Sequence, residues 1–321
     1  MDFLRSVANL FFFTLALQLG SCLPVHGQPN QTGQPNQTSQ PNQTGQPNQT
    51  SQPNQTFLWS VETPTNTVYL LGSIHMLSAE DYPLAPPIQA AFEDAETVVF
   101  EVDFSAARSQ EAAAIIYQRA LPDSDRERMQ TALTPETYSL ARQAATEVGL
   151  PLANFNNLEP WFFTINLTVL KLLQLGFSGE YGVDAFLYQQ AVNMGKDILA
   201  LETIAEQMGF FDELPISTQS TLVEQTLTEL DSLETSFNEI RTAWKLGDVA
   251  AMENYVLGNL AAYPDVEAAL FTERNQNWLT QITPMLAQAD DYLVVVGAGH
   301  LVGETGLVQQ LQANGYVVEQ R

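Results

Sequence analysis

The chain contains few cysteines and few basic residues, and each shortage excludes a class of proteins. Cys22 is the only cysteine in 321 residues, so the chain can build neither an internal disulfide framework nor a cysteine-based zinc site. Only 12 lysines and arginines stand against 37 aspartates and glutamates, and the formal net charge of -25 repels nucleic acid and anionic lipid. We therefore expect no nucleic-acid partner. The acidity by itself identifies no metal site, because a solvated acidic surface also keeps an exported protein soluble.

The chain also lacks an apolar run long enough for a transmembrane helix, which needs about 20 residues. Residues 7–19 are almost wholly apolar and have the length of a signal-peptide core. Leu19-Gly20-Ser21-Cys22 follows and resembles a bacterial lipobox, where the signal peptide is cut and the new terminal cysteine is lipidated. We predict a signal peptide at 1–21 and an exported cell-envelope lipoprotein that contacts the membrane only through this anchor. The alternative is an ordinary signal peptide and a soluble secreted or periplasmic protein.

A repeat of Gln-Pro-Asn-Gln-Thr, each copy followed by one variable residue, begins at Gln28. It contains no apolar side chain to bury and no charge, so we expect a disordered, partly extended tether. Fully extended as polyproline II, the repeat would reach roughly 90 Å at about 3.1 Å for each residue. We therefore predict a lipobox cysteine plus tether at 22–56 and one folded domain at 57–321.

Two strands in the folded part each end in a glycine that is followed, three residues later, by a histidine. They are Val68-Tyr69-Leu70-Leu71-Gly72-Ser73-Ile74-His75 and Leu293-Val294-Val295-Val296-Gly297-Ala298-Gly299-His300. Such apolar runs bounded by glycine predict buried strands, and ligands bind at the carboxyl ends of strands in open α/β sheets. We expect both histidines in one site, since the third, His26, lies in the tether segment. The alternative is that each histidine only satisfies local hydrogen bonds.

Carboxylates are predicted at the ends of two further strands. The run 97–103 places Glu101 and Asp103 on one side of a strand, because side chains alternate with period two, and the run 197–203 places Glu202 near its end. Two histidines with nearby carboxylates suit a divalent transition metal, which can lower the pKa of its bound water to about 7. No HExxH motif occurs, so such a site must be assembled across strands. The alternative for these glutamates is to cap a loop or to pair with Arg274.

The order of the elements predicts an α/β fold with a central mixed sheet and a large, mostly helical middle region. A hairpin is predicted from 57 into the first histidine strand, helices from about 105 to 292, and a last strand at 316–319. Within the middle region, Leu222 to Trp244 carries apolar residues at three- and four-residue steps, which predicts one amphipathic helix facing the core. The apolar helix predicted at 161–177 falls short of a membrane span, so we expect it to be buried or to face a partner.

Two other enzyme classes are disfavoured by details of spacing. A serine hydrolase has little support, because the chain has no Gly-x-Ser-x-Gly elbow. A dinucleotide-binding fold is imitated by Gly297-Ala298-Gly299 with Gly303 and Glu319. There, however, the third glycine comes one residue late, and His300 stands where the pyrophosphate would pass.

Several motifs together resemble the TraB/PrgY/GumN family, which includes the Tiki proteins. They are Gly72-Ser73-Ile74-His75, Phe100-Glu101-Val102-Asp103, Leu201-Glu202-Thr203 with Glu206-Gln207, Glu273-Arg274-Asn275 and Gly297-Ala298-Gly299-His300-Leu301-Val302-Gly303. The resemblance covers about residues 57 to 321. It implies an α/β fold related to erythromycin esterase and the ChaN haem-binding proteins. Because Tiki proteins are metal-dependent proteases, it also implies metal or catalytic roles for His75, His300 and Glu101, and a place in the site for Arg274.

We therefore predict a metal-dependent hydrolase that acts on peptides. His75, His300 and Glu101 would bind one divalent ion such as manganese, cobalt or zinc. Arg274 would hold a carboxylate or an oxyanion, and Glu202 would position a group or take up a proton. The rival prediction is a binding module that sequesters a peptide or haem-like ligand without turnover, and the sequence does not separate the two.

Overall fold

The computed structural model describes residues 55–123, 126–258, 260 and 263–321. These ranges include nearly all of the predicted folded domain. The predicted signal peptide, the lipobox cysteine and nearly all of the tether lie outside the described residues. Within the described part, no helix is long and apolar enough to cross a membrane.

A six-stranded mixed sheet forms the centre of the fold, as predicted, with the strands in the order β4-β3-β5-β2-β1-β6. The strands are β1 (Leu58–Glu62), β2 (Thr67–Ser73), β3 (Thr97–Phe100), β4 (Asp197–Ala200), β5 (Tyr292–Gly297) and β6 (Val318–Gln320). Strands β2, β5, β3 and β4 run parallel, whereas β1 is antiparallel to both β2 and β6. The carboxyl ends of the four parallel strands therefore meet at one edge of the sheet.

The central strands β3 and β5 consist mostly of apolar residues, which suits strands that are covered by helices on both faces. All residues of β3 and β5 are buried, as expected of parallel strands that have no solvent-facing side. In the register of β2 with β5, Ser73 lies opposite Gly297. The two histidine-bearing turns therefore leave the sheet side by side and at the same level.

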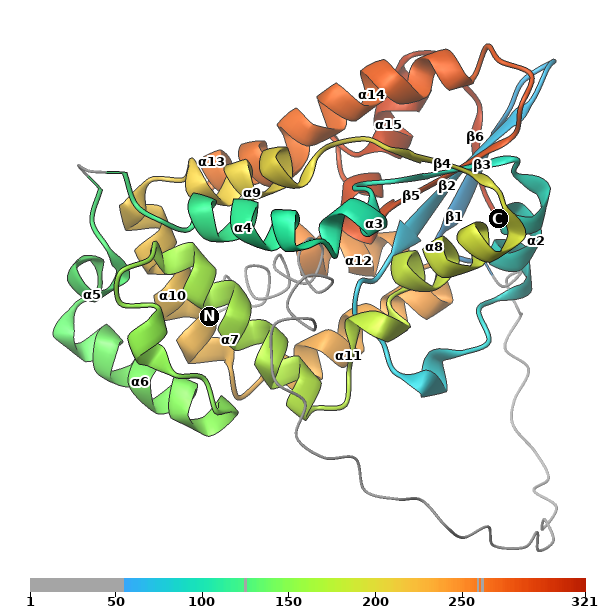
Figure 1. Ribbon diagram of the computed structural model, residues 1–321. Coiled ribbons are helices and arrows are strands. Elements are labelled where there is room, and N and C mark those ends of the chain that lie inside the picture. Colours follow the sequence, from blue (N-terminus) through green and yellow to red (C-terminus); the bar gives the residue numbers. More distant parts are fainter. Residues whose placement is uncertain (1–54, 124–125, 259, 261–262) are drawn as a thin grey trace, which may run out of the picture.

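Helices make up most of the chain between β3 and β5, as predicted, and many of them form a lobe beside the sheet (Figure 1). They are α3 (Phe104–Ala107), α4 (Gln110–Arg119), α5 (Met129–Ala132), α6 (Pro135–Val148), α7 (Pro160–Gln174), α8 (Val183–Met194), α9 (Ile204–Asp212), α10 (Ile216–Glu229), α11 (Leu233–Leu246), α12 (Val249–Val256), α13 (Pro264–Glu267) and α14 (Glu273–Met285). Two more, α2 (Pro86–Asp94) and α15 (Leu307–Ala313), lie outside this region. The apolar helix α7 is largely buried in the lobe.

The amphipathic helix predicted from Leu222 to Trp244 is two helices instead of one. Helix α10 ends at Glu229 and α11 begins at Leu233. Between them the Ser232 hydroxyl donates to the Glu229 carbonyl oxygen at 3.0 Å, a local bond that competes with the helical ladder. The predicted burial is confirmed for both ends of the stripe, because Leu222 and Trp244 are buried.

The strands that precede the predicted carboxylates are shorter than the sequence indicates. β3 ends at Phe100 and β4 ends at Ala200, so Glu101 and Glu202 lie in the turns that follow. The prediction that Glu101 and Asp103 face one way along a strand is therefore wrong. The Asp103 carboxylate instead caps α3, where it accepts from the Ser105 backbone N–H at 2.8 Å.

Candidate functional site

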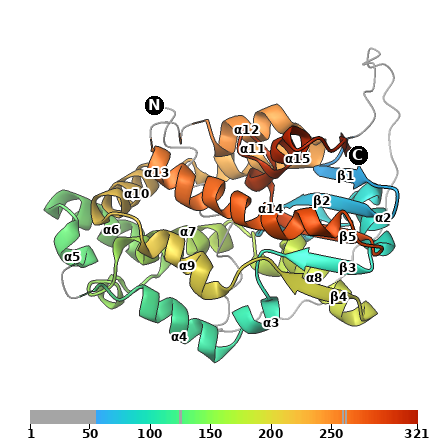
Figure 2. The same cartoon turned by 90° about the horizontal axis from the view of Figure 1, so that it is seen from above.

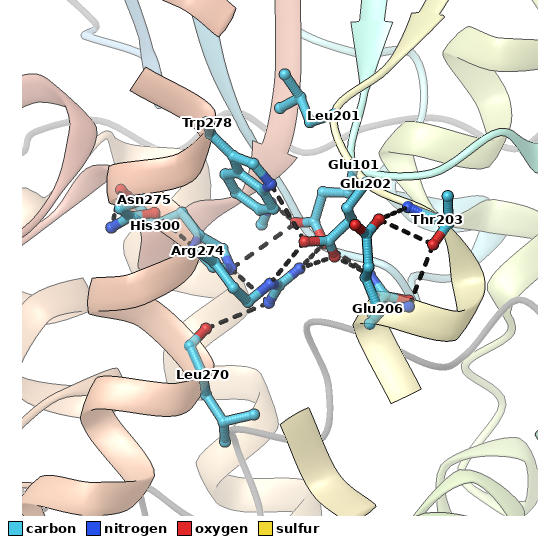
Figure 3. Close-up of polar contacts among 12 residues, drawn as sticks. Glu101, Leu201, Glu202, Thr203, Glu206, Leu270, Arg274, Asn275, Trp278 and His300 are labelled. Atoms are coloured by element: carbon cyan, nitrogen blue, oxygen red, sulfur yellow. Dashed lines mark hydrogen bonds and ion pairs between the residues drawn. The ribbon is translucent and has the colours of Figure 1, made fainter. Parts of the chain in front are cut away.

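The turns after four parallel strands bring the predicted site residues together. His75 follows β2, Glu101 follows β3, Glu202 follows β4, and His300 lies in a 3₁₀ turn, Ala298–Leu301, that follows β5. Helix α14 contributes Arg274 from the side, so that its guanidinium points between the two glutamates (Figure 3).

Arg274 is the cation at the centre of this cluster and is only 1% exposed. Its Nε donates to Glu202 Oε2 at 3.2 Å, and its Nη2 donates to Glu101 Oε2 and Glu202 Oε1 at 2.7 Å each. Its Nη1 donates to the Leu270 carbonyl oxygen at 3.2 Å and to His300 Nε2 at 3.0 Å. These bonds use all five N–H donors of a guanidinium. Burial would lower the pKa of Arg274, but the charges of Glu202 and Glu101 outweigh it and raise that pKa.

Both glutamates are held in place by further donors. Glu101 Oε1 accepts from the Gly297 backbone N–H at 2.7 Å, and Gln207 Nε2 donates at 3.1 Å to both Glu101 Oε2 and Glu202 Oε1. Trp278 Nε1 donates to Glu202 Oε2 at 3.2 Å, and its ring packs on the guanidinium. Burial raises the pKa of Glu202 despite the opposing charge of Arg274.

The tautomer of His300 follows from its two partners. Asn275 Nδ2 donates to the carbonyl oxygens of His300 and Thr305, at 3.3 and 2.9 Å, so Asn275 Oδ1 is the acceptor that faces His300 Nδ1 at 2.8 Å. Arg274 can only donate, so His300 Nε2 must accept. Burial lowers the pKa of His300, and the positive charges of Arg274 and His75 lower it further. His300 is thus a neutral imidazole with its proton on Nδ1.

His75 is oriented by a different group, the carboxylate of Asp184. His75 Nδ1 hydrogen-bonds to Asp184 Oδ2, and Asp184 is 3% exposed in the first turn of α8. Burial alone would lower the pKa of His75, but the charge and hydrogen bond of Asp184 outweigh it and the pKa is raised. His75 Nε2 lies 4.0 Å from Glu101 Oε1, and His300 Nε2 lies at the same distance from that oxygen. Both Nε2 atoms therefore face one carboxylate oxygen.

A glycine allows α8 to approach His75 closely enough for this contact. The Val183 backbone N–H donates to the Ile74 carbonyl oxygen at 3.0 Å. A Cβ atom added to Gly182 would lie 2.3 Å from the His75 carbonyl oxygen, so a larger residue would force the two segments apart.

Sequence reasoning missed three residues that complete this arrangement. Asn275 and Gln207 stand inside the quoted motifs, next to residues already chosen, and could have been found there. Asp184 lies shortly after a glycine at the start of a predicted helical stretch, but nothing in its spacing connects it with His75. The alternative considered for Glu101 and Glu202, pairing with Arg274, is what the structure shows for both.

The donor groups present fit a metal ion in kind. Histidines that bind metals usually donate from the other ring nitrogen to an oxygen acceptor, as both histidines do here. Their spacing is wider than in a closed site, because adjacent ligands at about 2.1 Å from one ion lie roughly 3 Å apart. Accordingly, no group of three acidic, histidine or cysteine side chains within the described ranges is close enough to hold an ion as it stands.

Comparisons with known proteins identify a family and several relatives of the chain. The chain is 26% identical to protein YbaP of Escherichia coli (strain K12) over 76% of this chain and 87% of YbaP. It is 24% identical to metalloprotease TIKI2 of Xenopus tropicalis and 21% identical to metalloprotease TIKI1 of Danio rerio, each over 82% of this chain. The chain spans 59% and 63% of the lengths of these two relatives. No solved structure matches. The profile of the TraB/PrgY/gumN family matches residues 57–320, and the chain therefore belongs to that family.

Proposed function

We propose that the chain is a metal-dependent hydrolase that acts on peptides, in the cell envelope and anchored through Cys22. The observation that carries the proposal is that two histidine Nε2 atoms face the same oxygen of Glu101, each at 4.0 Å. The metalloprotease names of two relatives support the reaction class. The lipobox-like motif at 19–22 supports the location, with a soluble secreted or periplasmic protein as the alternative.

In this proposal His75, His300 and Glu101 hold manganese, cobalt or zinc. A bound ion of this kind supplies a water molecule whose pKa is lowered to about 7. Asp184 and Asn275 keep the Nε2 atoms of the two histidines directed at Glu101. The polar groups that the ion needs are thus already oriented by the fold.

Arg274 and Glu202 take the supporting roles. Arg274 donates to both oxygens of Glu202, so we assign Glu202 to positioning the guanidinium. Arg274 Nη2 is bound by two carboxylates, whereas the partners of Nη1 are neutral, namely the Leu270 carbonyl and His300. Nη1 is therefore the nitrogen of Arg274 that would donate to a substrate carboxylate or oxyanion.

A non-catalytic module that sequesters a peptide or haem-like ligand is the second candidate. It is favoured by the hydrogen bond from Arg274 to His300 Nε2, because that bond occupies a lone pair that the ion would need. The guanidinium of Arg274 supplies hydrogen bonds to the acceptors of the cluster without a metal ion. Such an arrangement would suit a site that binds a ligand without turnover.

Metal content of the full chain, measured after loading with manganese, cobalt and zinc in turn, tests the proposal. We expect one equivalent in the wild type and in the control His26→Ala, and none in the double variant His75→Ala, His300→Ala. Peptide cleavage should then require the ion. No bound metal in the wild type would refute the metallohydrolase, and a peptide recovered intact in stoichiometric complex would favour the binding module.

A further inference from the structure

The outer edge of strand β4 is open along its whole length. In the described sheet β4 pairs only with β3, and Figure 2 shows no labelled element outside it. The backbone N–H groups of Asp197 and Leu201 donate toward β3, to Glu96 and Phe100 at 3.3 and 2.9 Å. Because the N–H groups of a strand point alternately to its two sides, those of Ile198 and Ala200 face outward.

The two edges of the sheet differ in how they are protected. Proteins usually block an exposed edge with charges, proline or a covering element. The opposite edge strand, β6, carries Glu319 and is followed by Arg321, which pairs with Glu62. After Asp197, β4 has neither charge nor proline, and its Leu199 side chain is 46% exposed. An edge left open in this way is suited to pairing with another extended segment.

The open edge leads directly to the candidate site. From Ala200 the chain continues through Leu201 to Glu202, whose carboxylate binds Arg274. A cavity of about 570 Å³ begins at the same point, lined on one side by 200–206 and on the other by residues of α3 and α4. Most of its exposed lining surface is apolar and includes Ile115 and Ile204, and the acidic residues Asp103, Glu111 and Glu206 also line it. A strand placed along β4 would therefore end beside both the cavity and Glu202.

We propose that β4 binds the backbone of an extended peptide as an additional strand, and that the adjoining cavity receives one of its apolar side chains. Main-chain groups recognise any extended peptide, and the pocket beside them gives selectivity for a side chain. This inference rests on the proposed function, because it takes the substrate to be a peptide. It adds that the substrate is unfolded or extended where it is bound.

Removal of one outward N–H tests this arrangement. Ala200→Pro deletes an N–H that faces away from β3, and Ala200→Ser is the matched control that keeps it. The probes are fluorescein-labelled nonapeptides with apolar residues at alternate positions, with binding to the full chain followed by anisotropy without added metal. We expect about tenfold weaker binding for Ala200→Pro and unchanged binding for Ala200→Ser. Peptides that are N-methylated at alternate residues should not bind.

Hydrogen exchange of the wild-type chain provides a test that needs no variant. We expect slower exchange in residues 197–201 when the peptide is added. Unchanged exchange there, equal binding by Ala200→Pro, or no binding by any peptide of the panel would overturn the inference. So would self-association of the wild type that Ala200→Pro abolishes, because a second copy would then occupy the edge.

The double variant His75→Ala, His300→Ala separates this inference from the proposed function. It should bind the peptides as the wild type does and should fail to cleave them. If the wild type binds through β4 but never cleaves, the inference stands and the hydrolase does not. If the wild type cleaves and Ala200→Pro has an unchanged KM, the hydrolase stands and the inference fails.

Discussion

At the scale of single residues, the site is organised by the donor pattern of Arg274. Two carboxylates, a carbonyl and an imidazole are bound by one planar group, which a lysine with three donors could not achieve. With Asp184, the cluster contains three carboxylates against one guanidinium. An excess of carboxylates over guanidinium groups is the arrangement that a divalent cation would complement.

Asp184→Asn should weaken metal binding about 10- to 100-fold, as is typical when a group that orients a metal-binding histidine is changed. The asparagine amide can donate to His75 Nδ1, which would move the ring proton to Nε2 and block the lone pair. Cobalt titration of the full chain measures the change. Asp103→Asn is the matched control, because Asp103 also lies at the start of a helix but makes no bond to histidine. Equal affinity in wild type and Asp184→Asn would show that Asp184 does not orient the ligand.

At the scale of elements, helix α7 begins at a buried ion cluster away from the site. Glu159 precedes α7 and is fully buried, with Arg126 Nη1 at 2.9 Å from its Oε1 and Gln219 Nε2 donating to its Oε2 at 2.7 Å. Burial raises the pKa of Glu159 to about 7, although the Gln219 hydrogen bond and the charge of Arg126 lower it in part. The helical lobe thus contains a carboxyl group that is protonated more readily in the folded state.

This raised pKa predicts a pH dependence of stability. A group whose pKa rises on folding stabilises the folded state at low pH, so the contribution of Glu159 should be lost as pH rises from about 4.5 to about 7. The side chain of Glu159→Gln cannot ionise. As pH rises across this range, the free energy of unfolding of the variant should therefore increase relative to that of the wild type, by up to about 3 kcal/mol. Urea unfolding at a series of pH values measures the difference. A constant difference between the two proteins would contradict the prediction.

At the scale of the whole molecule, the two ends of the described chain are joined at one edge of the sheet. Strand β6 pairs with β1. The Arg321 backbone N–H donates to the Leu58 carbonyl oxygen, and the Thr56 backbone N–H donates to the Arg321 carbonyl oxygen. Gln320 Nε2 also donates to the carbonyl oxygens of Thr56 and Gly247, at 3.0 and 2.8 Å. The last strand therefore protects the edge that β1 would otherwise expose.

Deleting residues 318–321 should lower the free energy of unfolding by roughly 4 kcal/mol or more, because the hydrogen bonds named above and those of the β1–β6 ladder contribute about 1 kcal/mol each. It should also promote self-association, because the edge of β1 becomes available for pairing. Denaturant unfolding and size-exclusion chromatography measure the two effects. The double substitution Glu319→Ala, Arg321→Ala keeps the strand and removes the surface ion pairs together with the hydrogen bond from Arg321 Nε to Ser60 Oγ, so it should cost less than the deletion. Similar losses of unfolding free energy in the deletion and in the double substitution would show that the side chains, and not the backbone pairing of β6, stabilise this edge.

The sequence by itself determined the α/β class, the approximate positions of the strands and five residues that the structure brings together in the candidate site. Apolar runs that end at glycine are local patterns, and parallel strands place their carboxyl ends at one edge, so His75, His300, Glu101 and Glu202 could be expected there. Arg274 was predicted to lie in the site from the motif Glu273-Arg274-Asn275. Tertiary structure decided where β3 ends, which separates Glu101 from Asp103, and it also divided the helix predicted from 222 to 244. It alone brought Asp184 to His75, because that contact depends on the packing of α8 against the turn after β2, and no local pattern encodes the distance between segments so far apart in the chain.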